Sequence, residues 1–360
     1  MGSVRDYLQL FRAQTAAVEG AGFPLAAWIG GAPLWTLPLF ALVGILAHFG
    51  GFGENGITDL AYDRLDPSKA EHPLVTGRMT FRRAIGLVYG CQAAGVVLFA
   101  AIMVATGHPY AAVPVFAFVG YIFLGHAYNF TGKWWKPGAV LEISGAFCLA
   151  FLAMATAWTG RADAVVWAVA VYAFLFTAFQ IAIAGELKEL ARPNEENLLR
   201  RLGSRVESPV PAMDELLSVA KRYGAIVNVG HRALTGDWLF TSSRAWVLAN
   251  VLSAAKAVAL GAVAWMLGGP SWGMVVGIAA WAIFSVYSFA LLRSGPWNRP
   301  CRVKTMGIGE ATSYLLLVFA LASSLWPYLL VTFLVLPVVW FVSMNRALWV
   351  GSGSAWAPGV

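Results

Sequence analysis

Residues 35–63 read WTLPLFALVGILAHFGGFGENGITDLAYD, an apolar run that ends in an acidic stretch. Residues 35–49 contain one His and no formal charge. The end of the run carries an oxygen-bearing side chain at every fourth position, at Asn55, Asp59 and Asp63. In a helix each step of four residues turns by about 400°, so the three groups drift by only about 80° over roughly 12 Å of rise. The pattern predicts a helix end with two carboxylates and an amide on one face.

A basic segment follows this acidic helix end. Residues 64–83 carry five basic side chains, at Arg64, Lys69, Arg78, Arg82 and Arg83. An acidic face between an apolar span and a basic loop suits Mg²⁺, a hard cation that takes carboxylate oxygens and keeps substrate phosphate oxygens as further ligands. The sequence therefore indicates a Mg²⁺ site that also receives a phosphorylated substrate.

The composition of the whole chain is that of an integral membrane protein. Of its 360 residues, 59% are hydrophobic and 12% are charged, whereas soluble domains average about 25% charged residues. The net charge of +7 falls in loops between apolar spans, so membrane topology explains it and nucleic acid is not expected as a partner. The three cysteines, Cys91, Cys148 and Cys301, are too far apart for a metal-ligand or redox motif.

Ten stretches are long and apolar enough for a transmembrane helix, which needs about 20 such residues. They cover residues 14–31, 34–58, 81–106, 109–129, 138–159, 163–187, 245–267, 271–292, 309–325 and 327–346. The last two are divided only by Trp326-Pro327, so they could be one broken element. We predict an all-α protein, a polytopic membrane bundle of nine to ten transmembrane helices that encloses a lateral apolar chamber capped by cytoplasmic loops.

The distribution of Lys and Arg sets the orientation of this bundle. With the N-terminus inside, nearly all basic residues fall in the inner loops 59–80, 130–137, 188–244 and 293–308, and the short outer loops contain only Arg161. The active site would then face the cytoplasm. We interpret residues 1–360 as a single membrane domain, with residues 188–243 as an extended cytoplasmic cap that includes a short helix over 214–223.

A second acidic cluster lies at the inner end of the sixth span. Glu186 and Glu189 are three residues apart and share one helix face. Two acidic helix ends on one membrane face could together hold Mg²⁺ ions around a diphosphate, and the metals would neutralise the leaving group as an allylic C–O bond breaks. The apolar bundle would accept the isoprenoid tail and exclude water from the carbocation.

These residues resemble the UbiA superfamily of intramembrane prenyltransferases. Asn55xxxAsp59xxxAsp63 looks like its first aspartate-rich motif, and His72-Pro73-Leu74-Val75-Thr76-Gly77 is similar to its Arg-Pro-Leu/Ile-x-Ser-Gly run. Tyr128-Asn129-Phe-Thr-Gly-Lys133 resembles the Tyr…Lys segment after span four, and Arg12 lies where the family often has Arg-Pro. Glu186-Leu-Lys-Glu189 falls at the place of the second motif.

The resemblance implies a role for each matching residue. Asn55, Asp59 and Asp63 would bind Mg²⁺, and so would Glu186 and Glu189 from the other side. Lys133 and Arg78 are candidates for direct contact with the diphosphate, and Arg201 could also reach it. The catalytic set would be Asp59, Asp63 and Lys133.

The leading hypothesis is a Mg²⁺-dependent prenyltransferase, an enzyme of the membrane lipid phase that moves an isoprenyl group from its diphosphate to a lipophilic or aromatic acceptor. The alternative is a UbiA-type terpene cyclase, which needs no acceptor. The second motif, with Glu in place of Asp, and the longer loop after it favour the alternative. Two other departures, Gly56 in place of Asp and His72 in place of Arg, leave the acceptor and the reaction outcome open. A transporter is the competing class, but transport sites usually lie near the bilayer midplane.

Two further ionisable groups have open roles. Lys256 lies near the middle of the seventh span, where a charge is costly and often functional. It could equally pair with a buried acid. Glu142, near the start of span five, could line the chamber or pair with Lys133 or Lys136.

Overall fold

The computed structural model describes residues 3–64, 70–108, 111–132, 134–190, 196–207, 238–268, 273, 275–283, 296–298, 313–314, 316–317, 320–321 and 331–349. In these residues, six helices are long and apolar enough to cross a membrane: Leu34–Thr58, Phe81–Ala105, Ala112–Thr131, Lys136–Thr156, Ala164–Gly185 and Ser243–Gly268. Each matches a predicted span to within a few residues. The last three predicted spans lie wholly or partly outside the described residues, so the count of nine to ten stays a prediction.

The first predicted span, 14–31, is shorter in the structure. Helix α2 covers Ala17–Ile29, 13 residues, or about 20 Å against a hydrocarbon core of about 30 Å. The helix starts late because the preceding residues form turns, and Arg12 has a left-handed backbone with φ of 45°. Before these turns, helix α1 covers Val4–Leu10.

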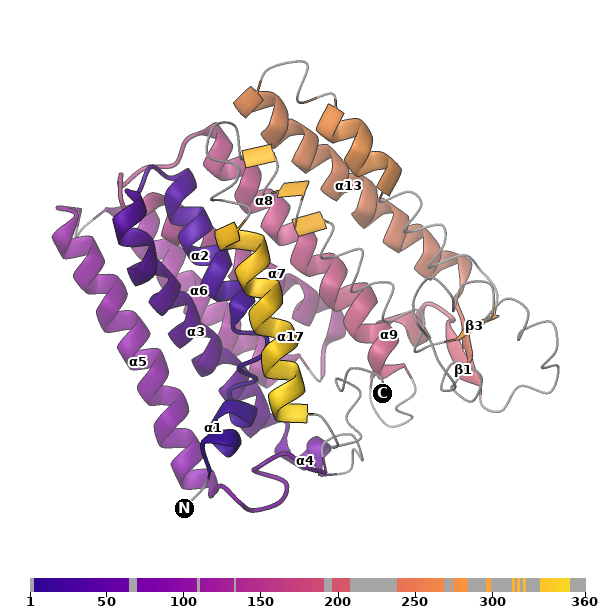
Figure 1. Ribbon diagram of the computed structural model, residues 1–360. Coiled ribbons are helices and arrows are strands. Elements are labelled where there is room, and N and C mark those ends of the chain that lie inside the picture. Colours follow the sequence, from indigo (N-terminus) through magenta and orange to yellow (C-terminus); the bar gives the residue numbers. More distant parts are fainter. Residues whose placement is uncertain are drawn as a thin grey trace.

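The long helices lie side by side in one bundle (Figure 1). Helix α3 (Leu37–Thr58) packs on α2 and on α5 (Phe81–Ala105), while α6 (Ala112–Thr131) packs on α7 (Lys136–Thr156). Helix α8 (Ala164–Phe179) lies between α7 and α13 (Ser243–Gly268). Helix α17 (Leu336–Trp349) packs on α2. One apolar core, which includes Phe40, Tyr172 and Phe179, runs through these contacts.

Glycine permits a very close approach between α2 and α3. A Cβ atom added at Gly44 would lie 2.4 Å from the backbone oxygen of Glu19. Small residues allow such backbone contacts between membrane helices. The same two helices share a buried pair in which His48 Nδ1 lies 2.7 Å from Glu19 Oε2.

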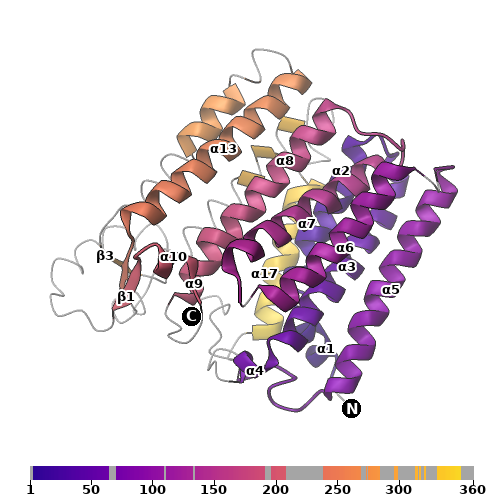
Figure 2. The same ribbon diagram turned by 180° about the vertical axis from the view of Figure 1, so that it is seen from behind.

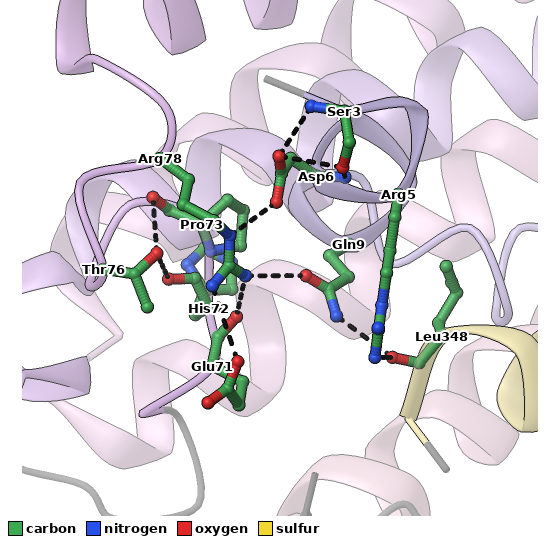
Figure 3. A network of polar contacts seen from close by, with 10 residues as sticks. All are labelled: Ser3, Arg5, Asp6, Gln9, Glu71, His72, Pro73, Thr76, Arg78 and Leu348. Atoms are coloured by element: carbon green, nitrogen blue, oxygen red, sulfur yellow. Dashed lines mark hydrogen bonds and ion pairs between the residues drawn. The ribbon is translucent and has the colours of Figure 1, made fainter. Parts of the chain in front are cut away.

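The N-terminal helix α1 joins the beginning of the chain to its far end (Figure 3). Arg78 Nε donates to Asp6 Oδ1 at 2.8 Å, and a second guanidinium nitrogen donates to the Glu71 backbone oxygen at 2.7 Å. From the same helix, Gln9 Nε2 donates to the backbone oxygen of Leu348 at 3.0 Å. Helix α1 thus holds the loop after the first acidic motif against the C-terminal end of α17.

The structure also contains a small sheet, which corrects the all-α prediction in this detail. Strands β1 (Arg205–Glu207), β2 (Trp238–Phe240) and β3 (Pro296–Asn298) are antiparallel in the order β1-β2-β3. Arg205 pairs with Phe240, and Leu239 pairs with Trp297. Strands of three residues are too short to leave a visible alternation in the sequence. The helix expected over 214–223 lies outside the described residues.

Gly44→Ala should lower the thermal unfolding midpoint by several degrees. The new methyl group would meet the Glu19 backbone oxygen, so α2 would have to move away from α3, and such overpacking typically costs about 1–3 kcal/mol. Gly51→Ala is the matched control on the same helix, because no described atom lies within 4 Å of its added Cβ. The midpoint of purified protein in detergent distinguishes them, and equal midpoints would contradict the close packing.

Asp6→Asn should destabilise the protein at neutral pH but not in acid. Burial raises the pKa of the Asp6 carboxyl, but hydrogen bonds from Arg78 and Ser3 lower it by more, so the net pKa lies below its ordinary value. The carboxylate therefore stabilises the fold above about pH 4, and this contribution is lost as the pH falls through the folded-state pKa.

We expect a loss of about 1 kcal/mol at pH 7, or roughly 2–4 °C in the midpoint, and convergence with the wild type below about pH 4. Glu71→Gln is the control, because the Glu71 side chain is more than half exposed and lies 3.4 Å from Arg78. A difference for Asp6→Asn that stayed constant from neutral pH to pH 3 would speak against this assignment.

Candidate functional site

The first acidic motif keeps its helical register through a small break. Helix α3 ends at Thr58, and α4 (Leu60–Asp63) adds a single turn after Asp59. The amide of Asp59 donates to the Asn55 backbone oxygen at 2.9 Å, and the amide of Asp63 donates to the Asp59 oxygen at 2.8 Å. Asp59 and Asp63 are 7% and 4% exposed. The predicted helix end is thus present, and its two carboxylates are buried.

Arg12 approaches this motif from the N-terminal segment. Its guanidinium donates to Asn55 Oδ1 at 3.1 Å and lies 5.4 Å from the centre of the Phe52 ring. A left-handed backbone is unfavourable for a residue with a side chain and often marks a functional position. His48 Nε2 and Thr15 Oγ1 both contact the Arg12 backbone oxygen, at 3.3 and 2.9 Å. These contacts hold Arg12 beside the motif.

Two departures from the family pattern meet in space. His72 is 3% exposed, and a Cβ atom added at Gly56 would lie 3.6 Å from His72 Cε1 and 3.7 Å from its Nε2. These are ordinary van der Waals distances, so the imidazole ring lies directly beside position 56. The two departures are therefore neighbours next to the acidic motif.

The second motif follows an irregular helix end. After α8, a π-helical turn covers Gln180–Gly185, and α9 covers Glu186–Glu189. Turns of this type are frequent at functional sites. The Glu186 carboxylate is buried. Its Oε1 atom lies 3.3 Å from Lys136 Nζ, and its Oε2 atom accepts a hydrogen bond from the Leu198 amide. The side chain of Glu189 lies outside the described part of the chain.

The two motifs lie at the same end of the bundle. In Figures 1 and 2, which view the molecule from opposite sides, α4 and α9 are both at the end that also carries α1. This agrees with the prediction that both motifs face one side of the membrane.

The sequence prediction does not include Glu54, which precedes Asn55. It is 2% exposed and is surrounded by donors from two other helices. His126 Nδ1 lies 2.7 Å from Oε1, Asn129 Nδ2 donates to Oε2 at 2.8 Å, and the Tyr89 hydroxyl donates to Oε1 at 3.1 Å. An acid in an apolar span is itself a signal, but its partners come from α5 and α6 and cannot be identified from spacing along α3.

The predicted basic contacts have varied surroundings. Lys133 lies outside the described residues. Arg78 holds α1 and the Glu71 segment, as described above, and Arg201 forms an ion pair with Glu196 and is more than half exposed. The predictions that these three residues bind diphosphate stay predictions.

The open roles of Lys256 and Glu142 become clearer. Lys256 is completely buried, and its ammonium lies 4.1 Å from the centre of the Phe179 ring, a cation–π contact. Glu142 accepts a hydrogen bond from Thr131 Oγ1 at 2.7 Å, whereas Lys136 contacts Glu186. Among the described residues Glu142 thus contacts Thr131, and the suggested pairing with Lys133 lies outside them.

The acidic residues fit a Mg²⁺ ion that arrives with its substrate. Among the residues that the structure describes, no three His, Cys, Asp or Glu side chains are grouped so that they could hold a metal by themselves. Mg²⁺ is usually bound through one or two carboxylates, substrate phosphates and water rather than by an all-protein cage. The oxygen donors of Asn55, Asp59 and Asp63 suit that mode.

Comparison with known proteins confirms the resemblance seen in the sequence. Residues 20–192 match the UbiA prenyltransferase family. No curated protein matches the chain. Among solved structures, the chain is similar to a UbiA homolog from Archaeoglobus fulgidus bound to GPP and Mg²⁺, with 19% identity, a TM-score of 0.54, and coverage of 88% of this chain and 100% of that one.

Two further structures show similar likeness. The apo UbiA homolog from Aeropyrum pernix K1 has 16% identity and a TM-score of 0.50, over 85% of this chain and 96% of that one. A structure concerned with digeranylgeranylglyceryl phosphate synthase in membranes has 16% identity and a TM-score of 0.50, over 94% of this chain and 99% of that one. At such identities these likenesses establish the fold.

Proposed function

We propose that this protein, whose residues 20–192 match the UbiA prenyltransferase family, ionises an isoprenyl diphosphate in the membrane with the help of Mg²⁺ and transfers the prenyl group to a lipophilic or aromatic acceptor. The observation that carries the proposal is the pair of acidic helix ends, α4 and α9, at one end of an apolar bundle. A solved relative of the same fold binds GPP and Mg²⁺. The orientation of the basic loops supports a cytoplasmic site.

In this proposal, polar residues would bind the metal and the diphosphate, and the apolar core would exclude water. Asn55, Asp59 and Asp63 would hold Mg²⁺ from one side, and Glu186 and Glu189 from the other. When bound, the metal supplies positive charge next to the diphosphate oxygens. Lys133, with Arg78 and Arg201, would contact the diphosphate. The apolar core would receive the prenyl chain and keep water from the reacting carbon.

The reaction itself is a substitution at the allylic carbon. The C–O bond to the diphosphate breaks, and the electron pair leaves with the diphosphate. The allylic cation then accepts an electron pair from the acceptor, which loses a proton. Without an acceptor, a double bond of the same chain would supply the electron pair, and the cation formed by ring closure would lose a proton to give a neutral hydrocarbon; this would be the cyclase reaction.

The acidic residues argue against a transporter. Transport sites usually lie near the bilayer midplane, whereas both motifs lie at one end of the bundle (Figure 1). The cyclase stays as the second candidate, because the second motif uses Glu in place of Asp and a longer loop follows it.

Asp59→Asn should reduce metal-dependent release of diphosphate by about a hundredfold or more, since loss of one charge-stabilising group at a reaction centre typically costs 10²–10³ in rate. Asp163→Asn is the matched control: Asp163 caps α8 through a hydrogen bond from the Val166 amide and lies in a predicted outer loop. Release is measured with purified protein, Mg²⁺ and a prenyl diphosphate. Undiminished release by Asp59→Asn would exclude the proposed metal site.

The acceptor requirement separates the two candidate reactions. We expect membranes with the protein to release diphosphate slowly from prenyl diphosphates alone and to form a prenylated product only after an aromatic or lipophilic acceptor is added. Donors of increasing chain length are compared by mass spectrometry of the lipid extract. A cyclic hydrocarbon formed without acceptor, and absent with Asp59→Asn, would establish the cyclase instead.

A further inference from the structure

The segment from Asn129 to Lys136 touches both acidic motif regions. At its beginning, Asn129 Nδ2 donates to Glu54 Oε2 at 2.8 Å, next to Asn55 of the first motif. At its end, Lys136 Nζ lies 3.3 Å from Glu186 Oε1 of the second motif. Asn129, Lys136, Glu54 and Glu186 are all buried. In the sequence, the predicted diphosphate ligand Lys133 lies between the two anchors.

The described part of this segment is compact. The amides of Trp134 and Trp135 donate to the Thr131 backbone oxygen at 2.9 and 3.2 Å. A Cβ atom added at Gly132 would lie 2.5 Å from the Tyr128 oxygen, and one at Gly138 would lie 1.8 Å from the Trp135 ring. A segment packed this closely keeps its two ends at a fixed separation.

The anchors are strong because each joins buried polar groups. A buried carboxylate is costly unless donors surround it, and Glu54 has three, from Tyr89, His126 and Asn129. Removal of either partner from a buried charged pair leaves the other uncompensated. The chain therefore resists separation of the segment from either motif.

We propose that residues 129–132 and 134–136 form a brace, anchored at Glu54 and at Glu186, that sets the spacing of the two acidic motifs. Glu54 and Lys136 act in it as positioning residues. This rests on the proposed function, because the spacing matters if Mg²⁺ and diphosphate bridge the two motifs. Reacting groups displaced by 1 Å can lose about a hundredfold in rate.

The test uses the Mg²⁺ concentration that gives half-maximal diphosphate release, compared for Glu54→Gln, Lys136→Met and the double variant. We expect each single change to raise this concentration about tenfold, because either one releases the brace. The double variant should also show about a tenfold rise, since a brace freed at one end has no further spacing to lose. Non-additivity of this kind is the signature of groups that act together.

Glu142→Gln, on α7 next to this segment, is the control. Glu142 binds Thr131 but neither motif, so the half-maximal Mg²⁺ concentration should stay within about twofold of the wild type. The thermal midpoint without ligand verifies folding of each variant. If Glu54→Gln does not fold, Asn129→Ala takes its place, because it removes the same anchor and leaves Glu54 with its other donors.

The outcomes separate the two proposals. Wild-type protein that releases no diphosphate from any donor would end the proposed function, and the brace with it. Active wild-type protein whose double variant shows a rise of about a hundredfold, the product of the single effects, would overturn the brace alone. Single variants with unchanged Mg²⁺ dependence would do the same.

Discussion

The structure depends on how buried carboxylates are compensated at one end of an apolar bundle. A carboxylate removed from water is costly unless it finds donors or a cation. Glu54 is compensated by Tyr89, His126 and Asn129, and Glu186 by Lys136 and the Leu198 amide. Because each of these partners belongs to another element, satisfying the acids also fixes how the helix ends lie relative to one another.

Neighbouring polar residues at the end of α3 contact different parts of the protein. On α3, successive residues point in directions about 100° apart, so Glu54 faces α5 and α6 while Asn55 meets Arg12 from the N-terminal segment. Structural contacts on one side of the helix leave Asp59 and Asp63, a turn or more further on, to form the end of the motif. A single helix end can thus be held rigidly and still present the oxygens that we propose to bind Mg²⁺.

Local sequence was enough for six long helices and for the acidic repeat. The six observed spans follow from uninterrupted apolar stretches, and the four-residue repeat of Asn55, Asp59 and Asp63 survives the break at Thr58. What the sequence could not supply were pairings between elements. Nothing in the spacing predicts that Lys136 contacts Glu186 rather than Glu142, or that three-residue strands from distant loops form a sheet. The left-handed Arg12, which delays α2, also depends on contacts with His48.

The departures from the family pattern are better understood together than singly. Judged separately, Gly56 loses an acid and His72 loses a permanent positive charge, and each would weaken a diphosphate site. In the structure the His72 ring lies 3.6 Å from a Cβ atom added at Gly56, so the loss of an anionic group and the loss of a cationic one occur at neighbouring positions. Removing both members of a charge pair is far less costly than removing one. With both positions changed, the first motif presents Asn55, Asp59 and Asp63, and the Arg12 guanidinium donates to Asn55.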